Sequence, residues 1–188
     1  MTLKNPRGFD TDELQALVKY DIEKGDIEKA LTKVKEILTD KNPPTEIYAI
    51  LARLYAQLGL FERAKDNFTT YLKSHPEASV ERFQLGIAHF DCGENQEALS
   101  IWDALLEKEP IHPPTLFYRS LVLAQSGKLA EAKQSIDILL KSTAVDNLYY
   151  SRAKELLQEI NTGRTQKNNK SEGHDSVMKV IPKDAYQS

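Results

Sequence analysis

Four histidines and one cysteine are the residues of this sequence that could bind a transition metal or act as nucleophiles. His75, His89, His112 and His174 are far apart in the chain and lack the spacing of a metal-ligand set. His89 and Cys92 form an H-x-x-C pair, but two ligands are too few for a zinc site. Cys92 has no second cysteine for redox chemistry. We therefore predict no metal and no cofactor, and a structural role for His89.

Motifs that position a phosphate or a nucleophile are also absent from the sequence. It contains no G-x-x-x-x-G-K-[ST], no G-x-G-x-x-G and no G-x-S-x-G. Carboxylates are numerous but stand beside basic residues, as in Glu23/Lys24 and Glu107/Lys108, which is typical of solvent-exposed helix faces. A basic stripe with interleaved aromatic residues, which would indicate nucleic acid binding, is missing. We predict a protein that has no catalytic residues and does not bind nucleic acid.

The composition is that of a chain that can bury a core. Its 188 residues are 40% hydrophobic and 28% charged, with a formal net charge of -3. No run of about 18 apolar residues is present, so we expect no membrane span. The first ten residues contain no apolar segment of a secretory signal, although a sequence stripped of its signal would look the same. The single cysteine excludes an intrachain disulfide, and we expect a cytoplasmic location.

The elements of the fold follow from a glycine that is followed five residues later by an alanine. The pairs are Gly25/Ala30, Gly59/Ala64, Gly93/Ala98 and Gly127/Ala132, and successive glycines are 34 positions apart. Apolar residues recur at three- and four-residue spacings on both sides of each glycine, which predicts two helices per unit. Glycine tolerates the positive φ that ends the first helix, and the small alanine allows the second helix to approach closely.

This 34-residue unit resembles the tetratricopeptide repeat, a helix-turn-helix. The resemblance covers residues 11 to about 144. It implies an all-α fold, a right-handed superhelical solenoid of four hairpins at about 11–44, 45–78, 79–112 and 113–146. Asp10 and Glu13 form a plausible capping box for the first helix, and Pro76 and Pro110 are expected to end helices. Asp21 stands where the family has an aromatic residue, as expected for a more polar terminal repeat.

Segments on either side of the repeats complete the predicted organisation. Residues 1–10 are an N-terminal extension, and residues 11–161 are the repeat array with its capping helix. That helix covers residues 146–161, with Asp146 capping its start and Gly163 closing its end. Residues 162–188 lack an apolar period and are expected to be a flexible polar tail that contains a short apolar segment, 177–182.

By the same resemblance, the concave groove lined by the first helix of each hairpin binds a protein or peptide segment. Groove positions are mostly charged or small in the first two repeats and mostly apolar in the last two. An apolar surface of this size indicates a partner with apolar anchors. The residues predicted to bind it are Val80, Phe83, Ile87, Phe90, Phe117 and Leu121. Arg53 and Lys19 are predicted to steer acidic flanks of the partner.

Two alternatives concern the groove itself. Phe83 and Phe117 fall four to five positions from core leucines, so that a small error in the repeat register would make them core residues. The second alternative is a groove that binds the carboxylate tail of a chaperone. Such a groove needs basic and amide side chains at fixed positions in three successive repeats, and the sequence does not have this set. Those positions hold Ala49, Arg53, Gln84, Pro114 and Tyr118 in one register, and Gln15, Lys19, Ile50, Val80 and Gln84 in the other.

Three functions follow from these features. The leading one is a non-catalytic adaptor or scaffold that binds a partner segment in the groove. The second is a bacterial secretion or assembly chaperone that holds a client protein, and the third is a self-assembling structural scaffold. The tail residues Val177, Met178, Val180 and Ile181 could also dock in the apolar half of the groove of the same chain or a neighbour. The linker of roughly 15 residues spans about 20 Å as a coil, which is enough reach.

Overall fold

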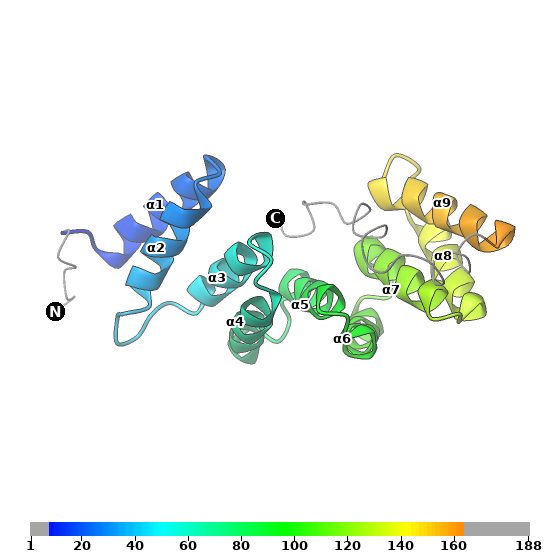
Figure 1. The fold of residues 1–188 in the computed structure, drawn as a ribbon, viewed down its shortest axis with the longest axis horizontal. Coiled ribbons are helices and arrows are strands. Elements are labelled where there is room, and N and C mark those ends of the chain that lie inside the picture. Colours follow the sequence, from blue (N-terminus) through cyan, green and yellow to red (C-terminus); the bar gives the residue numbers. More distant parts are fainter. Residues whose placement is uncertain (1–7, 164–188) are drawn as a thin grey trace. The chain divides into compact units, whose positions relative to one another are not determined.

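The computed structural model describes residues 8–163, which form nine α-helices and contain no β-strand (Figure 1). The predicted all-α fold class is confirmed. Residues 1–7 and 164–188, which include the predicted tail and its apolar segment, lie outside the described residues. The helices in chain order are α1 (Thr11–Glu23), α2 (Ile27–Ile37), α3 (Glu46–Gln57), α4 (Phe61–Ser74), α5 (Ser79–Asp91), α6 (Asn95–Lys108), α7 (Pro113–Gln125), α8 (Leu129–Ser142) and α9 (Leu148–Thr162).

Two compact units divide the described residues, one formed by residues 8–81 and the other by residues 82–163, with the boundary inside α5. In the first unit, α1 packs against α2, α3 packs against α4, and α2 contacts α3. In the second unit, α7 packs against α8, α6 contacts α7, and α9 contacts both α7 and α8. Within each unit, helices that follow one another in the sequence therefore pack together, as in helical hairpins. The number of hairpins and the handedness of the array stay predictions.

The turn between the two helices of each pair has a recurring hydrogen bond. Gly25, Gly59, Gly93 and Gly127 have φ between +72° and +78°, a conformation that other residues rarely adopt. The residue after each glycine donates its backbone N–H to the carbonyl five residues earlier, at N···O distances of 2.8–3.0 Å. This bond satisfies a carbonyl that the helix end leaves without an intrahelical partner. The predicted role of these glycines is confirmed.

Small residues and prolines also act as the sequence predicts. The four alanines that follow the glycines, Ala30, Ala64, Ala98 and Ala132, are each 0% exposed. A larger side chain at these positions would have to displace the facing helix. Helices α4 and α6 each end two residues before a proline, Pro76 and Pro110, which has no N–H to continue the helix.

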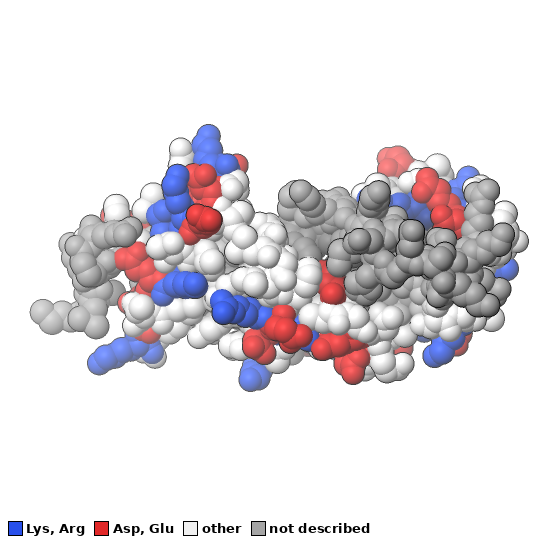
Figure 2. All heavy atoms as spheres, viewed as in Figure 1, with Lys and Arg blue, Asp and Glu red and all other residues white. Residues whose placement is uncertain are grey.

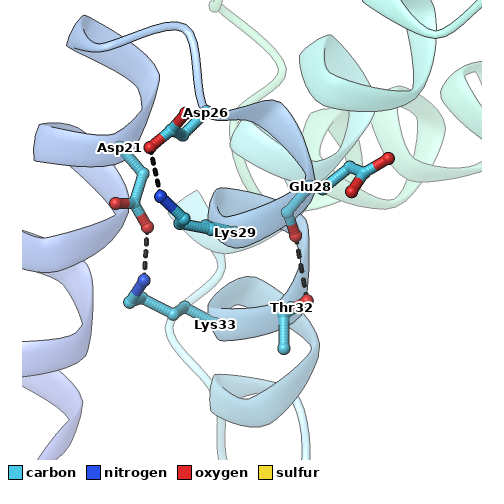
Figure 3. A network of polar contacts seen from close by, with 6 residues as sticks. All are labelled: Asp21, Asp26, Glu28, Lys29, Thr32 and Lys33. Atoms are coloured by element: carbon cyan, nitrogen blue, oxygen red, sulfur yellow. Dashed lines mark hydrogen bonds and ion pairs between the residues drawn. The ribbon is translucent and has the colours of Figure 1, made fainter.

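Polar contacts hold both ends of α1. At its start the predicted capping box is confirmed: Glu13 N–H donates to Asp10 Oδ1 at 2.9 Å, and Asp10 N–H donates to Glu13 Oε2 at 2.9 Å. Near its end Asp21 is buried and pairs with the ammonium group of Lys33 on α2 (Figure 3). A carboxylate is tolerated at this buried position because the facing helix supplies the opposite charge.

The N-cap of helix α9 lies one residue later than predicted. Its N-cap residue is Asn147, whose Oδ1 accepts a hydrogen bond from the Tyr149 N–H at 2.9 Å. The prediction that Asp146 caps this helix is wrong, because the cap requires the extended backbone that Asn147 adopts immediately before the first helical turn. The other end was predicted correctly: Gly163 has φ +71° and closes the helix.

Candidate protein-interaction site

Four of the six apolar residues predicted to line the groove are buried. Phe83 is 6% exposed and Phe117 is 2% exposed, and Ile87 and Phe90 are buried as well. Val80 is 43% exposed, and Leu121 is half-buried. Val80 belongs to the first unit and the other five belong to the second. The structure therefore leaves Val80 and Leu121 as the members of the predicted set with accessible side chains.

Phe83 is part of an aromatic cluster that joins α5, α6 and α7. Its ring centroid lies 5.6 Å from that of Tyr118, 5.7 Å from that of His112 and 6.5 Å from that of Trp102. The Trp102 indole N–H donates to the Phe83 carbonyl at 3.3 Å. Trp102 also lies against Gly86, one helical turn after Phe83. Phe83 thus packs as a core residue, which is the alternative that the sequence left open.

Phe117 links α7 to the last helix. Its ring centroid lies 5.4 Å from that of the neighbouring Tyr118 and 5.8 Å from that of Tyr149 on α9. Leu121 follows Phe117 by four residues and therefore lies on the same side of α7. We call Phe117, Leu121, Tyr149 and the adjacent Arg152 the α7–α9 face. Phe117 is its buried base, whereas Leu121, Tyr149 and Arg152 are half-buried.

Arg152 is the residue that the sequence analysis missed. Its guanidinium carbon lies 5.8 Å from the centroid of the Tyr149 ring, and its Nη1 is buried without a hydrogen-bond partner among the described residues. One signal could have identified it: Arg152 lies 34 residues after Tyr118, which lies 34 residues after Gln84. Extending the repeat period by one unit into the predicted capping helix places these three side chains at equivalent positions of α5, α7 and α9.

The two basic residues predicted to steer a partner differ in their surroundings. Arg53 Nη1 lies 3.0 Å from Glu81 Oε1, and both side chains are largely buried, so that its charge is locally compensated. Lys19 is exposed on α1. On the face drawn in Figure 2, the basic side chains of the described residues are interspersed with acidic ones. Of the two, Lys19 is the residue with a charge that solvent and a partner can reach.

Histidine and cysteine side chains make structural contacts in the described part of the chain. His89 Nδ1 lies 2.6 Å from Glu94 Oε2 across the α5–α6 turn, and Cys92 beside it is half-buried. His112 caps α7 by accepting from the Thr115 N–H at 3.4 Å, and burial lowers its pKa while the charge of Glu109 acts in the opposite direction. Residues 8–163 contain no group of three potential ligands arranged to hold a metal ion.

None of the helices within residues 8–163 is both long enough and apolar enough to cross a bilayer.

Comparison with known families identifies the repeat. Residues 83–147 match the family model described as tetratricopeptide repeat. This segment includes most of α5 and extends to the N-cap of α9, and therefore contains the residues of the aromatic cluster. Residues 83–147 therefore belong to the tetratricopeptide repeat family, as the sequence predicts, and the described residues have an all-α helical repeat fold.

A curated relative shares part of the sequence. The probable biofilm formation methyltransferase WspC of Pseudomonas putida is 34% identical over 90 residues, which are 48% of this chain. The matched segment is 21% of WspC, so the chain spans about a fifth of that protein. The methyltransferase description applies to WspC as a whole.

Several solved structures share the fold. A tetratricopeptide repeat protein from Parabacteroides merdae superposes with a TM-score of 0.71 at 20% identity, over 81% of this chain and 60% of that protein. YrrB, described as having an unusual peptide-binding site, gives a TM-score of 0.68 at 17% identity, over 76% of this chain and 73% of its own. MamA from Desulfovibrio magneticus gives a TM-score of 0.66 at 16% identity, over 84% of this chain and 96% of its own. These similarities support the fold.

Proposed function

We propose that this protein is a non-catalytic adaptor or scaffold that binds a segment of another protein on the α7–α9 face. The observation that carries the proposal is the arrangement of that face. The half-buried side chains of Leu121 and Tyr149 come from different helices, and the Tyr149 ring packs against the buried Phe117. Preorganised aromatic and aliphatic side chains of this kind are typical anchors at protein interfaces.

The residues that the sequence analysis predicted to bind the partner have different roles in this proposal. Leu121 provides direct contact and Phe117 is the buried base of the same face, whereas Phe83, Ile87 and Phe90 are buried core residues of the second unit. Val80 is exposed in the first unit and would provide a separate apolar contact on that unit. Lys19 provides steering, whereas Arg53 is held by Glu81. A cytoplasmic location is part of the same proposal and rests on the single cysteine.

The test uses the half-buried Leu121, because glutamate in place of Phe83 or Phe117 would put a charge into the core. The full-length protein and the variant Leu121→Glu are used to capture proteins from the native cell extract. Ile138→Glu, at an exposed apolar residue of α8, is the matched control. We expect a protein that is retained by wild type and by Ile138→Glu and lost with Leu121→Glu, with circular dichroism showing that all three are folded. Equal capture by all three would contradict the proposal.

The captured protein then decides between an adaptor and the two other functions. A purified partner that binds reversibly in calorimetry supports an adaptor. One aggregation-prone client that remains bound throughout purification would instead indicate a secretion or assembly chaperone. A mass that increases with concentration in light scattering, with no captured protein, would indicate a self-assembling scaffold.

Docking of the tail residues Val177, Met178, Val180 and Ile181 remains a proposal, because they lie outside the described residues. Charge favours it: residues 162–188 contain five Lys/Arg and three Asp/Glu, a net of +2, and the remaining residues must carry -5 to give the total of -3. In full-length protein, Val180→Glu combined with Ile181→Glu should increase the binding of a hydrophobic dye. Unchanged dye binding would contradict docking.

A further inference from the structure

We propose that Arg152 is a specificity residue of the α7–α9 face and that it binds an acidic side chain of the partner segment. This inference rests on the proposed function and adds the chemistry of the partner to it. It begins from the buried Nη1 of Arg152, which has no hydrogen-bond partner among the described residues. A buried charged donor without an acceptor is unfavourable, and native proteins seldom keep one without a reason.

Two other half-buried arginines, Arg119 and Arg53, have acidic partners. Arg119 donates from Nε to Asp103 at 2.6 Å and from Nη1 to Ser135 at 2.6 Å. Arg53 pairs with Glu81 at 3.0 Å. Arg152 differs from both, since the described contact of its guanidinium group is with the Tyr149 ring, at 5.8 Å. The described residues therefore leave one donor of the Arg152 guanidinium without an acceptor, and the half-buried group keeps hydrogen-bonding capacity for a ligand.

The surroundings of Arg152 define what such a ligand must contain. The Tyr149 ring lies 5.8 Å from Phe117 and 6.5 Å from Tyr118, so the guanidinium stands beside an aromatic layer. An ion pair in such surroundings is less screened than one in water, and a planar guanidinium can bind both oxygens of a carboxylate. The apolar neighbours would contact an aliphatic or aromatic side chain of the same segment. The expected partner thus presents an aspartate or glutamate close to an apolar residue.

The repeat period indicates how the charge of Arg152 would fix the position of the partner segment along the helices. Gln84, Tyr118 and Arg152 occupy equivalent positions at 34-residue intervals on α5, α7 and α9. The first two are neutral and fully buried, whereas the third is a half-buried cation. Within the second unit, the acidic residue of the partner would therefore bind at α9, and its apolar residue would contact α7.

The experiment is a selection from a random dodecapeptide library displayed on phage, with the full-length protein as bait. Wild type, Leu121→Glu, Arg152→Gln, Arg152→Lys and Lys154→Gln are compared. Lys154→Gln removes the same charge from an exposed position of the same helix and is the matched control. We expect wild type and Lys154→Gln to enrich peptides in which Asp or Glu lies close to an apolar residue. Arg152→Gln should lose the acidic preference and keep the apolar one, and Arg152→Lys should retain part of the acidic preference.

A selected peptide and its Glu→Gln form then give the affinity. We expect the Glu→Gln change to weaken binding to wild type by about ten-fold or more, and binding to Arg152→Gln by about two-fold or less. An equal loss with both proteins would overturn the role of Arg152.

The outcomes separate this inference from the proposed function. Peptides that depend on Leu121 but show no acidic preference would overturn the inference and leave the proposed function standing. Failure of wild type to select peptides, or selection that is indifferent to Leu121→Glu, would overturn both. Arg152→Gln should keep the thermal midpoint of wild type or raise it, because it removes a buried donor without an acceptor. A lowered midpoint would indicate a structural role for Arg152 and would also overturn the inference.

Discussion

At the scale of single residues, the indole of Trp102 occupies the space that a side chain at residue 86 would need. A Cβ atom on Gly86 would lie 2.1 Å from Trp102 Nε1, the nitrogen that donates to the Phe83 carbonyl. We expect Gly86→Ala to lower the free energy of unfolding by about 1–3 kcal/mol from overpacking, despite the roughly 1 kcal/mol that alanine gains over glycine in a helix. Equilibrium unfolding in urea measures this change.

A double-mutant cycle with Trp102→Phe provides the control for this prediction. The smaller ring leaves room beside residue 86, so Gly86→Ala should cost less in the Trp102→Phe background than in wild type. Additive effects of the two substitutions would show that the indole is not what excludes a side chain there.

His112 connects the stability of the protein to pH. It caps α7 through a ring nitrogen that accepts from the Thr115 N–H, and burial lowers its pKa from the usual 6.5. Above that value the ring is neutral in both the folded and unfolded states. As pH falls below it, the unfolded chain takes up a proton before the folded protein does, so we expect stability to decrease toward acid.

The substitution His112→Asn isolates this contribution. Asparagine keeps an acceptor at the N-cap but does not titrate, so the variant should lose less stability than wild type between about pH 7.5 and about pH 5. The midpoint of urea unfolding, measured across this range, provides the comparison. Parallel pH profiles for the two proteins would contradict the assignment.

At the scale of helices, the pair α1–α2 encloses a charge pair in place of an aromatic contact. Asp21 and Lys33 face each other with side chains that are 7% and 19% exposed, whereas Asp26 and Lys29 pair at the surface, 2.6 Å apart (Figure 3). Removing one partner of a buried pair leaves an uncompensated charge. We expect Lys33→Met to destabilise the protein by about 2–4 kcal/mol, and Lys29→Met, the matched control, by less than about 1 kcal/mol.

The double variant Asp21→Phe/Lys33→Met tests whether the pair itself stabilises the helices. Phenylalanine restores the aromatic residue typical of the repeat, and apolar replacement of a buried pair is often neutral or stabilising. We therefore expect the double variant to recover most of the stability that Lys33→Met loses, as measured in urea. A double variant as unstable as the single one would show that this site requires charge.

Local sequence signals were sufficient to predict the helices and turns, but they were insufficient to predict which helix faces are buried. Turns, close-packed alanines and the α1 capping box depend on residues within a few positions of one another, and the sequence predicts them. The environment of Phe117 depends on Tyr149, which lies 32 positions further along the chain, so an intrahelical pattern could not distinguish groove from core. Arg152 escaped notice because the repeat period was not extended into α9.

At the scale of the whole molecule, charge and contact are expected to affect different steps of binding. The chain is weakly acidic, with a net charge of -3, and an exposed lysine such as Lys19 offers a local attraction for acidic flanks of a partner. Attraction between exposed charges acts mainly on the rate of encounter and is screened by salt. Apolar contacts at the α7–α9 face act mainly on the lifetime of the complex. The predicted site residues can therefore be separated by kinetics.

The corresponding prediction compares Lys19→Glu with Leu121→Ala in binding to the captured partner, measured by surface plasmon resonance at low and high salt. Lys19→Glu should lower the association rate by about two- to five-fold at low salt and much less at high salt, with the dissociation rate nearly unchanged. Leu121→Ala should instead raise the dissociation rate at both salt concentrations.

Lys73→Glu is the control for the charge reversal, because it makes the same change at an exposed residue of α4, the second helix of its pair. If Lys73→Glu slows association as much as Lys19→Glu does, the effect comes from net charge and Lys19 has no special position. If Lys19→Glu changes neither rate, the partner lacks the acidic flanks that the steering hypothesis requires. An acidic residue bound by Arg152 would still remain possible, since that contact is expected to determine the lifetime of the complex rather than the rate of encounter.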